Sequence, residues 1–168
     1  MSRLWVRDPS SAQEINFSIL SYIKYMNKTT ENSFLNDRTA IERLKKEYTE
    51  HKNLVIGFDF DNTIFDYHKK GLELNSTIEL LARCSDLGFT MCLYSVVNTS
   101  DSFRVMNEKI HFCNELNINV NYVNKSPLLH KHQNPDNYKP FFSILLDDRA
   151  GLGSAYNILK TTLDELDI

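Results

Sequence analysis

Two pairs of acidic residues directly follow apolar segments of this 168-residue chain, after residues 54–58 and after residues 141–146. The four acids are Asp59, Asp61, Asp147 and Asp148. Carboxylates beside buried apolar residues are costly unless a cation neutralises them, and two of them about 4 Å apart repel by about 4 kcal/mol at an effective dielectric of 20. Mg²⁺ typically binds one or two such carboxylates together with waters and substrate phosphate. The pattern therefore predicts a Mg²⁺ site.

The first acidic pair also has a spacing that suits covalent catalysis. Asp59 and Asp61 are two residues apart, so on an extended backbone both side chains project to the same side. One carboxylate could then attack while the other transfers a proton. The alternative is a polar turn that only ends a strand. Ser95, after the next apolar segment, could donate a hydrogen bond to a phosphoryl oxygen, or could simply cap a helix.

The apolar segments alternate with helical patterns, which predicts how these residues are positioned. The continuous apolar run 54–58 is typical of a strand buried on both faces. Further strands are predicted at 89–95, 118–123 and 141–146, and helices at 76–88, 103–116 and 152–166. Ser76-Thr77-Ile78-Glu79 matches a capping box for the first of these helices, and Gly88 is its expected end.

Strands that alternate with helices predict an α/β fold, with a Rossmann-like parallel sheet and helices on both faces. Ligands of such sheets bind beyond the carboxyl ends of the strands, where the four acids would lie. Two earlier helices are predicted to begin near Asp8-Pro9 and near Asp37. The chain is thereby divided into an N-terminal helical extension, residues 1–53, and an α/β domain, residues 54–168.

Composition and charge exclude several classes of protein. With 42% hydrophobic and 24% charged residues, the chain is expected to be globular rather than disordered. Its net charge of −3 gives no global basic surface for nucleic acid, although His130-Lys131-His132 could meet phosphates or be an ordinary solvated loop. No apolar stretch approaches the roughly 18 residues that span a membrane, and the N-terminus lacks a signal-peptide pattern. The three cysteines have no CxxC spacing, so a cytoplasmic location is expected.

The order of these residues resembles the motifs of the haloacid dehalogenase-like (HAD) superfamily of phosphotransferases, over about residues 54–166. The match comprises Asp59-x-Asp61-x-Thr63, then Ser95, then a lysine, then Asp147-Asp148. By similarity, Asp59 would be the nucleophile that forms an aspartyl-phosphate. Asp61 would protonate the leaving oxygen and then activate water. Thr63, the hydroxyl residue of the first motif, would support the turn on the substrate side.

The resemblance also implies a phosphate-binding pair and a metal. Ser95 would bind the phosphoryl group together with a lysine, for which Lys125 is preferred and Lys139 is the alternative. Either lysine could also be a solvated loop residue. Asp147 and Asp148 would hold Mg²⁺ together with Asp59 and the main-chain carbonyl of Asp61.

The spacing between the motifs resembles that of capless members of the superfamily. Between Thr63 and Ser95 there is room only for a short flap and one helix, so an open site for a large substrate is implied unless the N-terminal helices cover it. Leu146-Asp147-Asp148-Arg149 resembles the fourth motif in the phosphatase domain of polynucleotide kinase-phosphatases. The expected activity is Mg²⁺-dependent hydrolysis of a phosphomonoester, on a nucleotide or a nucleic-acid end. The alternatives are a phosphatase of sugar phosphates or phosphoproteins, and a non-catalytic binding module.

Overall fold

The computed structural model describes residues 36–98, 100–125 and 140–168. The helices are α2 (Asp37–His51), α3 (Asn75–Asp86), α4 (Ser102–Glu115) and α5 (Leu152–Leu166). The strands are β1 (Val55–Phe58), β2 (Thr90–Leu93), β3 (Tyr122–Val123) and β4 (Ile144–Leu146). The helix predicted near Asp8-Pro9 and the His130-Lys131-His132 segment lie outside the described residues.

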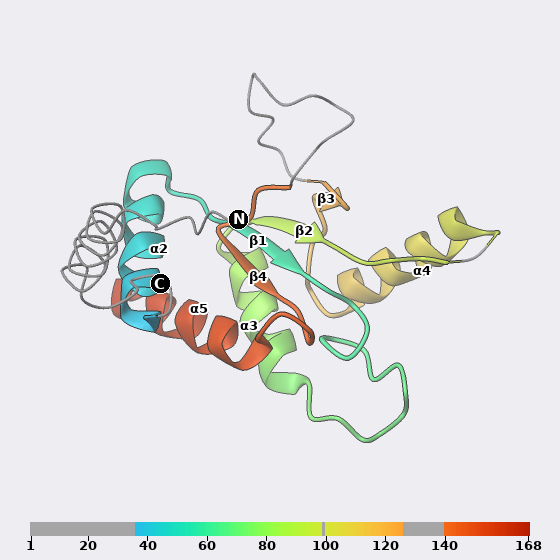
Figure 1. Ribbon diagram of the computed structural model, residues 1–168. Coiled ribbons are helices and arrows are strands. Elements are labelled where there is room, and N and C mark those ends of the chain that lie inside the picture. The colour runs from blue at the N-terminus through green and yellow to red at the C-terminus, as the bar shows by residue number, and fades with distance from the viewer. Residues whose placement is uncertain (1–35, 99, 126–139) are drawn as a thin grey trace, which may run out of the picture. The chain divides into compact units, whose positions relative to one another are not determined.

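The four strands form a parallel sheet in the order β3-β2-β1-β4 (Figure 1). From the central β1 the chain moves outward to β2 and β3, and then returns to β4 on the other side of β1. The predicted α/β fold with a parallel sheet is therefore confirmed. Phe58 is in register with both Leu93 and Leu146, so the residues that follow β1, β2 and β4 start at the same edge. This edge contains the point where strand order reverses, which is where ligands of such sheets bind.

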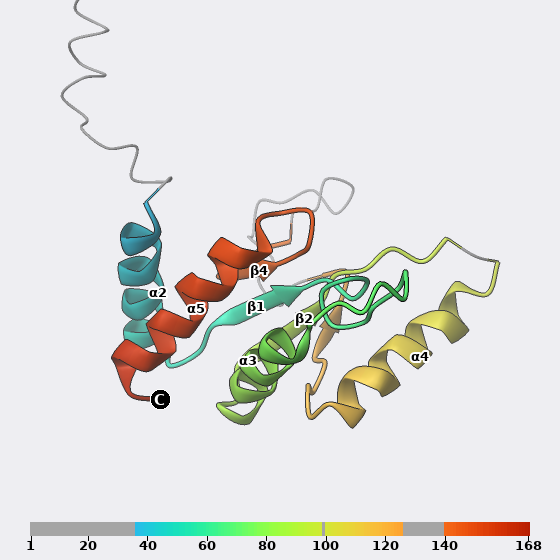
Figure 2. The same ribbon diagram turned by 90° about the horizontal axis from the view of Figure 1, so that it is seen from below.

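The main core lies on one face of the sheet. Ile56, Phe58 and Leu146 are fully buried there, in a cluster with apolar residues of α2, α3, α4 and α5. Figure 2 shows α3 and α4 on the same side of the sheet. On the opposite face of β1, the ring of Phe142 packs directly on Gly57. A Cβ at Gly57 would lie only 2.6 Å from the ring, so this close approach requires glycine.

Helix α2 belongs to the same compact unit as the sheet. It packs against α5 (Figure 2) and buries Leu44 in the shared core. Its Arg43 guanidinium donates a 2.8 Å hydrogen bond to the carbonyl of Ser143, at the start of β4. The chain divides into Met1–Asn36 and Asp37–Ile168, and α2 lies in the second of these units.

Two local expectations were wrong. Helix α3 begins at Asn75 with Leu74 as the N-cap and no side-chain cap, so the predicted capping box does not form. Instead the carboxylate of Glu73 accepts the N–H of Asn75 at 2.9 Å. The predicted strand 118–123 shortens to Tyr122–Val123 because the Ile118 N–H turns back to a carbonyl of α4. Gly88 does end the helix region, with a φ of 76° that favours glycine.

Candidate active site

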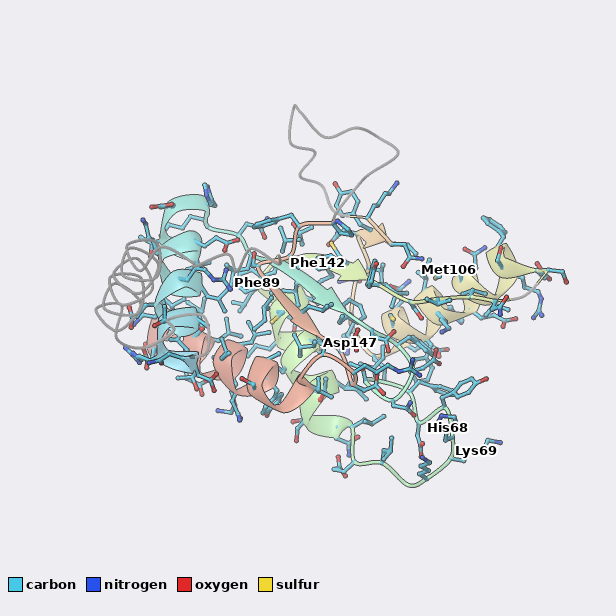
Figure 3. The ribbon with its side chains drawn as sticks, in the orientation of Figure 1. His68, Lys69, Phe89, Met106, Phe142 and Asp147 are labelled. Carbon is cyan, nitrogen blue, oxygen red and sulfur yellow. The ribbon has the colours of Figure 1, made fainter. Side chains whose placement is uncertain are left out.

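The carboxyl ends of β1, β2 and β4 surround one cavity of about 220 Å³. Its lining includes all four predicted acids and four further residues: Asp59, Asp61, Asn62, Tyr94, Val96, Asp147, Asp148 and Arg149. Figure 3 shows Asp147 where β4 ends. The main-chain N–H of Asp59 donates to the carbonyl of Leu146 at 2.9 Å, which joins the two acidic strand ends directly. The predicted convergence of the acids is therefore confirmed as geometry.

The surroundings of Asp59 disfavour the ionised form of its carboxyl group. Burial raises its pKa to about 6, and repulsion from Asp147, Asp61 and Asp148 adds to this effect. A hydrogen bond from the N–H of Phe60 opposes the increase. A carboxylate in this position has an excess of negative charge around it, which a bound cation would relieve.

Lys109 of α4 supplies a positive charge to one side of the cavity. Its Nζ lies 2.7 Å from Oδ2 of Asp61 and 2.9 Å from Oγ of Ser95. The same ammonium lies 4.6 Å from the ring centroid of Phe60, in a cation–π contact. Only 11% of the Lys109 side chain is exposed. Lys109, Asp61 and Ser95 thus form a partly buried, hydrogen-bonded group, of which Asp61 lines the cavity together with Asp59.

An aromatic cluster shields this group from water. The ring of Phe60 packs on Phe65 and Phe112, with centroids 5.4 Å apart in each case. Phe60 itself is only 5% exposed, although it stands between two acids in the sequence. Low water access strengthens electrostatic interactions, so the contacts of Lys109 are stronger here than they would be on a surface.

Ser95 is fixed by a residue that the sequence analysis did not select. The side-chain amide of Asn124, after β3, accepts from the N–H of Ser95 and donates to its carbonyl, each at 2.9 Å. Asn124 has a φ of 52°, a left-handed conformation that asparagine adopts more readily than most residues. Asn124 therefore holds the Ser95 main chain and leaves the hydroxyl to face Lys109.

Thr63 and Asn62 connect the two acidic strand ends. Thr63 is fully buried, and its hydroxyl accepts the N–H of Asp148 at 3.2 Å. Its observed role is to hold the two loops together, in agreement with support of the turn, and its burial leaves no surface for a substrate. Asn62 has a buried Oδ1 with no hydrogen-bond partner.

Neither lysine considered from the sequence has the position that Lys109 has. Lys125 is exposed, and no ion pair joins it to a described residue of the site, while Lys139 lies outside the described residues. A signal for Lys109 was present in the sequence, because it lies three residues after Met106 and four before Cys113 on the apolar stripe of its helix. A lysine at such a position is partly buried and needs a partner.

The loop between β1 and α3, residues 59–74, contains no helix. The carboxylate of Asp66 accepts the N–H groups of Lys70, Gly71 and Leu72, which fixes the loop's shape. His68 and Lys69 are exposed at its tip (Figure 3). The described segments between the strands hold one helix each, or none, and contain no cap domain.

The oxygen atoms that line the cavity suit Mg²⁺ better than they suit a metal ion whose ligands are all side chains. In the described part of the chain, no three His, Cys, Asp or Glu side chains converge as an all-side-chain metal site requires. Mg²⁺ usually needs only one or two carboxylates, and its remaining ligands are waters and substrate phosphate. The raised pKa of Asp59 and the unpartnered Oδ1 of Asn62 are both consistent with a cation bound in this cavity.

Comparisons with known proteins add little to this description. No family model matches the chain, and no curated protein matches it. One similar solved structure, of a conserved protein coded by a locus from Bacteroides thetaiotaomicron, is 24% identical with a TM-score of 0.49, and the match covers 68% of this chain and 92% of that one. No described helix is long and apolar enough to cross a membrane.

Proposed function

We propose that this protein is a Mg²⁺-dependent phosphomonoester hydrolase that acts through a phosphorylated Asp59. One observation carries the proposal. A half-buried carboxylate with three acidic neighbours stands beside a lysine–serine pair, Lys109 and Ser95, on the ligand-binding edge of a parallel sheet. The nucleophile and the proton-transfer group line one small cavity, and donors for phosphoryl oxygens lie next to it, where Lys109 contacts both Asp61 and Ser95.

In the first step, a carboxylate oxygen of Asp59 forms a bond to phosphorus and the bond from phosphorus to the ester oxygen breaks. The ester oxygen leaves with the electron pair and takes a proton from Asp61. An arriving phosphate, with its negative oxygens, competes with Asp61 for the Lys109 ammonium.

In the second step, Asp61 takes a proton from water, and the water oxygen attacks the phosphorus of the aspartyl-phosphate. The bond between phosphorus and the Asp59 oxygen breaks, which releases inorganic phosphate and restores the carboxylate. Lys109 and the Ser95 hydroxyl hold phosphoryl oxygens throughout, because both are positioned before the substrate arrives.

Mg²⁺ would be held by one or two of the carboxylates of Asp59, Asp147 and Asp148, with the carbonyl of Asp61, waters and substrate phosphate as its other oxygen ligands. When bound, it offsets the repulsion between an anionic nucleophile and an anionic phosphate. Asn62 is available as a second polar group at this side of the cavity, because its Oδ1 lacks a partner.

Release of phosphate from p-nitrophenyl phosphate and from a panel of nucleotides and sugar phosphates tests the proposal. We expect turnover with Mg²⁺, loss of turnover in EDTA, and recovery on adding Mg²⁺ again. Asp59→Asn should reduce the rate at least about a thousandfold, as expected for loss of a nucleophile. Asp86→Asn, at an exposed acid on α3, is the control for a lost charge. Metal-independent turnover, or an active Asp59→Asn variant, would contradict the proposal.

A further inference from the structure

The cavity at the strand ends is small for a ligand-binding pocket. Its volume of about 220 Å³ is below the roughly 300 Å³ at which pockets begin to enclose a small-molecule ligand. A phosphoryl group at Asp59 therefore occupies the cavity, and the leaving group must extend to its margin. Three lining residues that the reaction does not use form this margin: Tyr94, Val96 and Arg149.

Tyr94 presents an aromatic surface that is held in place from behind. It follows β2, and its N–H donates to the carbonyl of Phe58 at 2.8 Å. Its ring packs edge-on against Phe142 at a centroid distance of 5.7 Å, and Phe142 in turn packs on Gly57. The Tyr94 side chain is nonetheless 41% exposed and lines the cavity. A fixed, accessible aromatic ring beside a cavity is a surface on which another ring can stack.

Arg149 supplies the second recognition element of the margin. It follows the acidic pair directly, is exposed, and has no ion pair with any described residue. A guanidinium forms paired hydrogen bonds with phosphate oxygens and also stacks on flat rings. An aromatic ring and a free guanidinium at one cavity suit a leaving group that contains a flat base, with or without a further phosphate.

We propose that Tyr94 and Arg149 bind the nucleoside part of a nucleotide whose phosphate is hydrolysed at Asp59. This inference rests on the proposed function. Tyr94 stacks on the base, and Arg149 contacts the base or the next phosphate. Sugar phosphates and phosphoserine lack a base and gain nothing from this margin. The nucleoside could belong to a free mononucleotide or to the terminal nucleotide of a strand, and both present the same chemistry.

A binding experiment and a kinetic experiment test the role of Tyr94. In the Asp59→Asn background, Tyr94→Leu should weaken binding of thymidine monophosphate about tenfold by calorimetry, whereas Tyr94→Phe should bind like the parent. In the active enzyme, Tyr94→Leu should lower the ratio of kcat/KM for thymidine monophosphate to that for ribose 5-phosphate about tenfold, chiefly through KM. Tyr67→Leu, at a tyrosine 60% exposed on the loop after β1, is the matched control.

The outcomes separate this inference from the proposed function. No phosphate release from any substrate overturns the proposed function, whereas release without a preference for nucleotides overturns only the role of the margin. An equal loss on nucleotide and ribose 5-phosphate in Tyr94→Leu also overturns it. Oligonucleotides with a 3′- or a 5′-phosphate identify the source of the nucleoside. A strand end is the source if their kcat/KM exceeds that of the mononucleotide and Arg149→Ala removes the excess, and a free nucleotide is the source if the mononucleotide is preferred.

Discussion

The two acidic strand ends of the cavity differ in what surrounds their carboxylates. At the end of β1, Asp61 pairs with Lys109, which is also bonded to Ser95 and covered by aromatic rings. At the end of β4, Asp147 accepts the main-chain N–H of Arg149 at 2.8 Å, and Asp148 is exposed. No ion pair joins either of these two acids to a cation in the described part of the chain. We call these regions the paired half and the open half of the site.

This difference indicates where the protein supplies a positive charge of its own and where a metal ion from solution is expected to supply it. The paired half holds its cation in a fixed position, as required for orienting phosphoryl oxygens. The open half retains uncompensated carboxylates beside Asp59, whose pKa is raised by burial and by these neighbours. Carboxylates without a protein cation are where a metal ion gains the most binding energy. The open half is therefore the side on which Mg²⁺ is expected.

Among the changes that test this comparison of the two halves, the largest effect is expected from removing the cation of the paired half. Lys109→Ala leaves Asp61 and the phosphoryl oxygens without a nearby positive charge. The loss of one such preorganised donor should lower kcat/KM about a hundredfold, or about 3 kcal/mol. Lys125→Ala is the direct comparison, because the sequence alone favoured Lys125, and its effect should be far smaller. Steady-state rates on p-nitrophenyl phosphate measure both variants.

A loss of activity in Lys109→Ala has two explanations, a damaged fold and a missing catalytic charge, and a second variant separates them. Lys109→Met keeps most of the buried volume and loses the charge, so it should lose activity like the alanine variant. Its Tm should fall because Asp61 loses its ion pair, so rates are compared at a temperature where circular dichroism shows both variants folded. A large loss from Lys125→Ala, with Lys109→Ala nearly as active as the parent, would assign the phosphate to Lys125. It would also show that the pair of Lys109 with Asp61 only stabilises the fold.

Much of the fold could be predicted because it depends on local patterns. The apolar runs before Asp59 and Asp147 marked buried parallel strands, and the helical stripe from 152 to 166 matches α5 (Leu152–Leu166). The capping box failed because a four-residue match does not decide where a helix begins. Glu73, outside the motif, accepts the first helical N–H instead.

The candidate site could be predicted only where its residues follow strands. Parallel strands end at one edge, so acids and a serine after them must be neighbours. Lys109 comes from the middle of α4, and only the packing of that helix brings its side chain to Asp61. Asn124 is a similar case, since its two hydrogen bonds to Ser95 depend on the pairing of β2 with β3. Both contacts follow from tertiary structure rather than from spacing.

A smaller effect is expected from disturbing the packing behind the open half. Gly57→Ala places a methyl group against the ring of Phe142, which supports Tyr94. Overpacking of this kind should lower the free energy of unfolding by about 1–3 kcal/mol. Gly153→Ala is the matched control, because a Cβ there meets no atom within 4 Å. Urea unfolding of the two variants measures the difference, and equal stabilities would contradict the close packing of Phe142.

The smallest effect concerns Asp59, whose carboxylate is repelled by the two acids of the open half. The pKa of Asp59 is raised in the folded protein to about 6 from its ordinary value of 3.8, so folding favours its protonated form. This contribution to stability is fully present below the unfolded pKa and is lost as the pH rises through about 6. The Asp59→Asn variant has no carboxyl group at this position, so it does not lose stability in this way as the pH rises. In EDTA, its stability relative to the parent should therefore improve between pH 4 and pH 8, by about 1 kcal/mol after allowance for partial exposure.

Thermal unfolding at several pH values, in EDTA and in Mg²⁺, measures this stability difference. Asp86→Asn controls for the loss of one negative charge at a remote, exposed position. Mg²⁺ should raise the Tm of the parent at pH 8 more than that of Asp59→Asn, because a ligand stabilises the state that binds it. Without metal, Asp59→Asn would then be more stable than the parent. This difference in stability would shrink or disappear when Mg²⁺ is added. A stability difference that changed with neither pH nor Mg²⁺ would mean that the open half has no uncompensated charge, and the comparison of the two halves would fail.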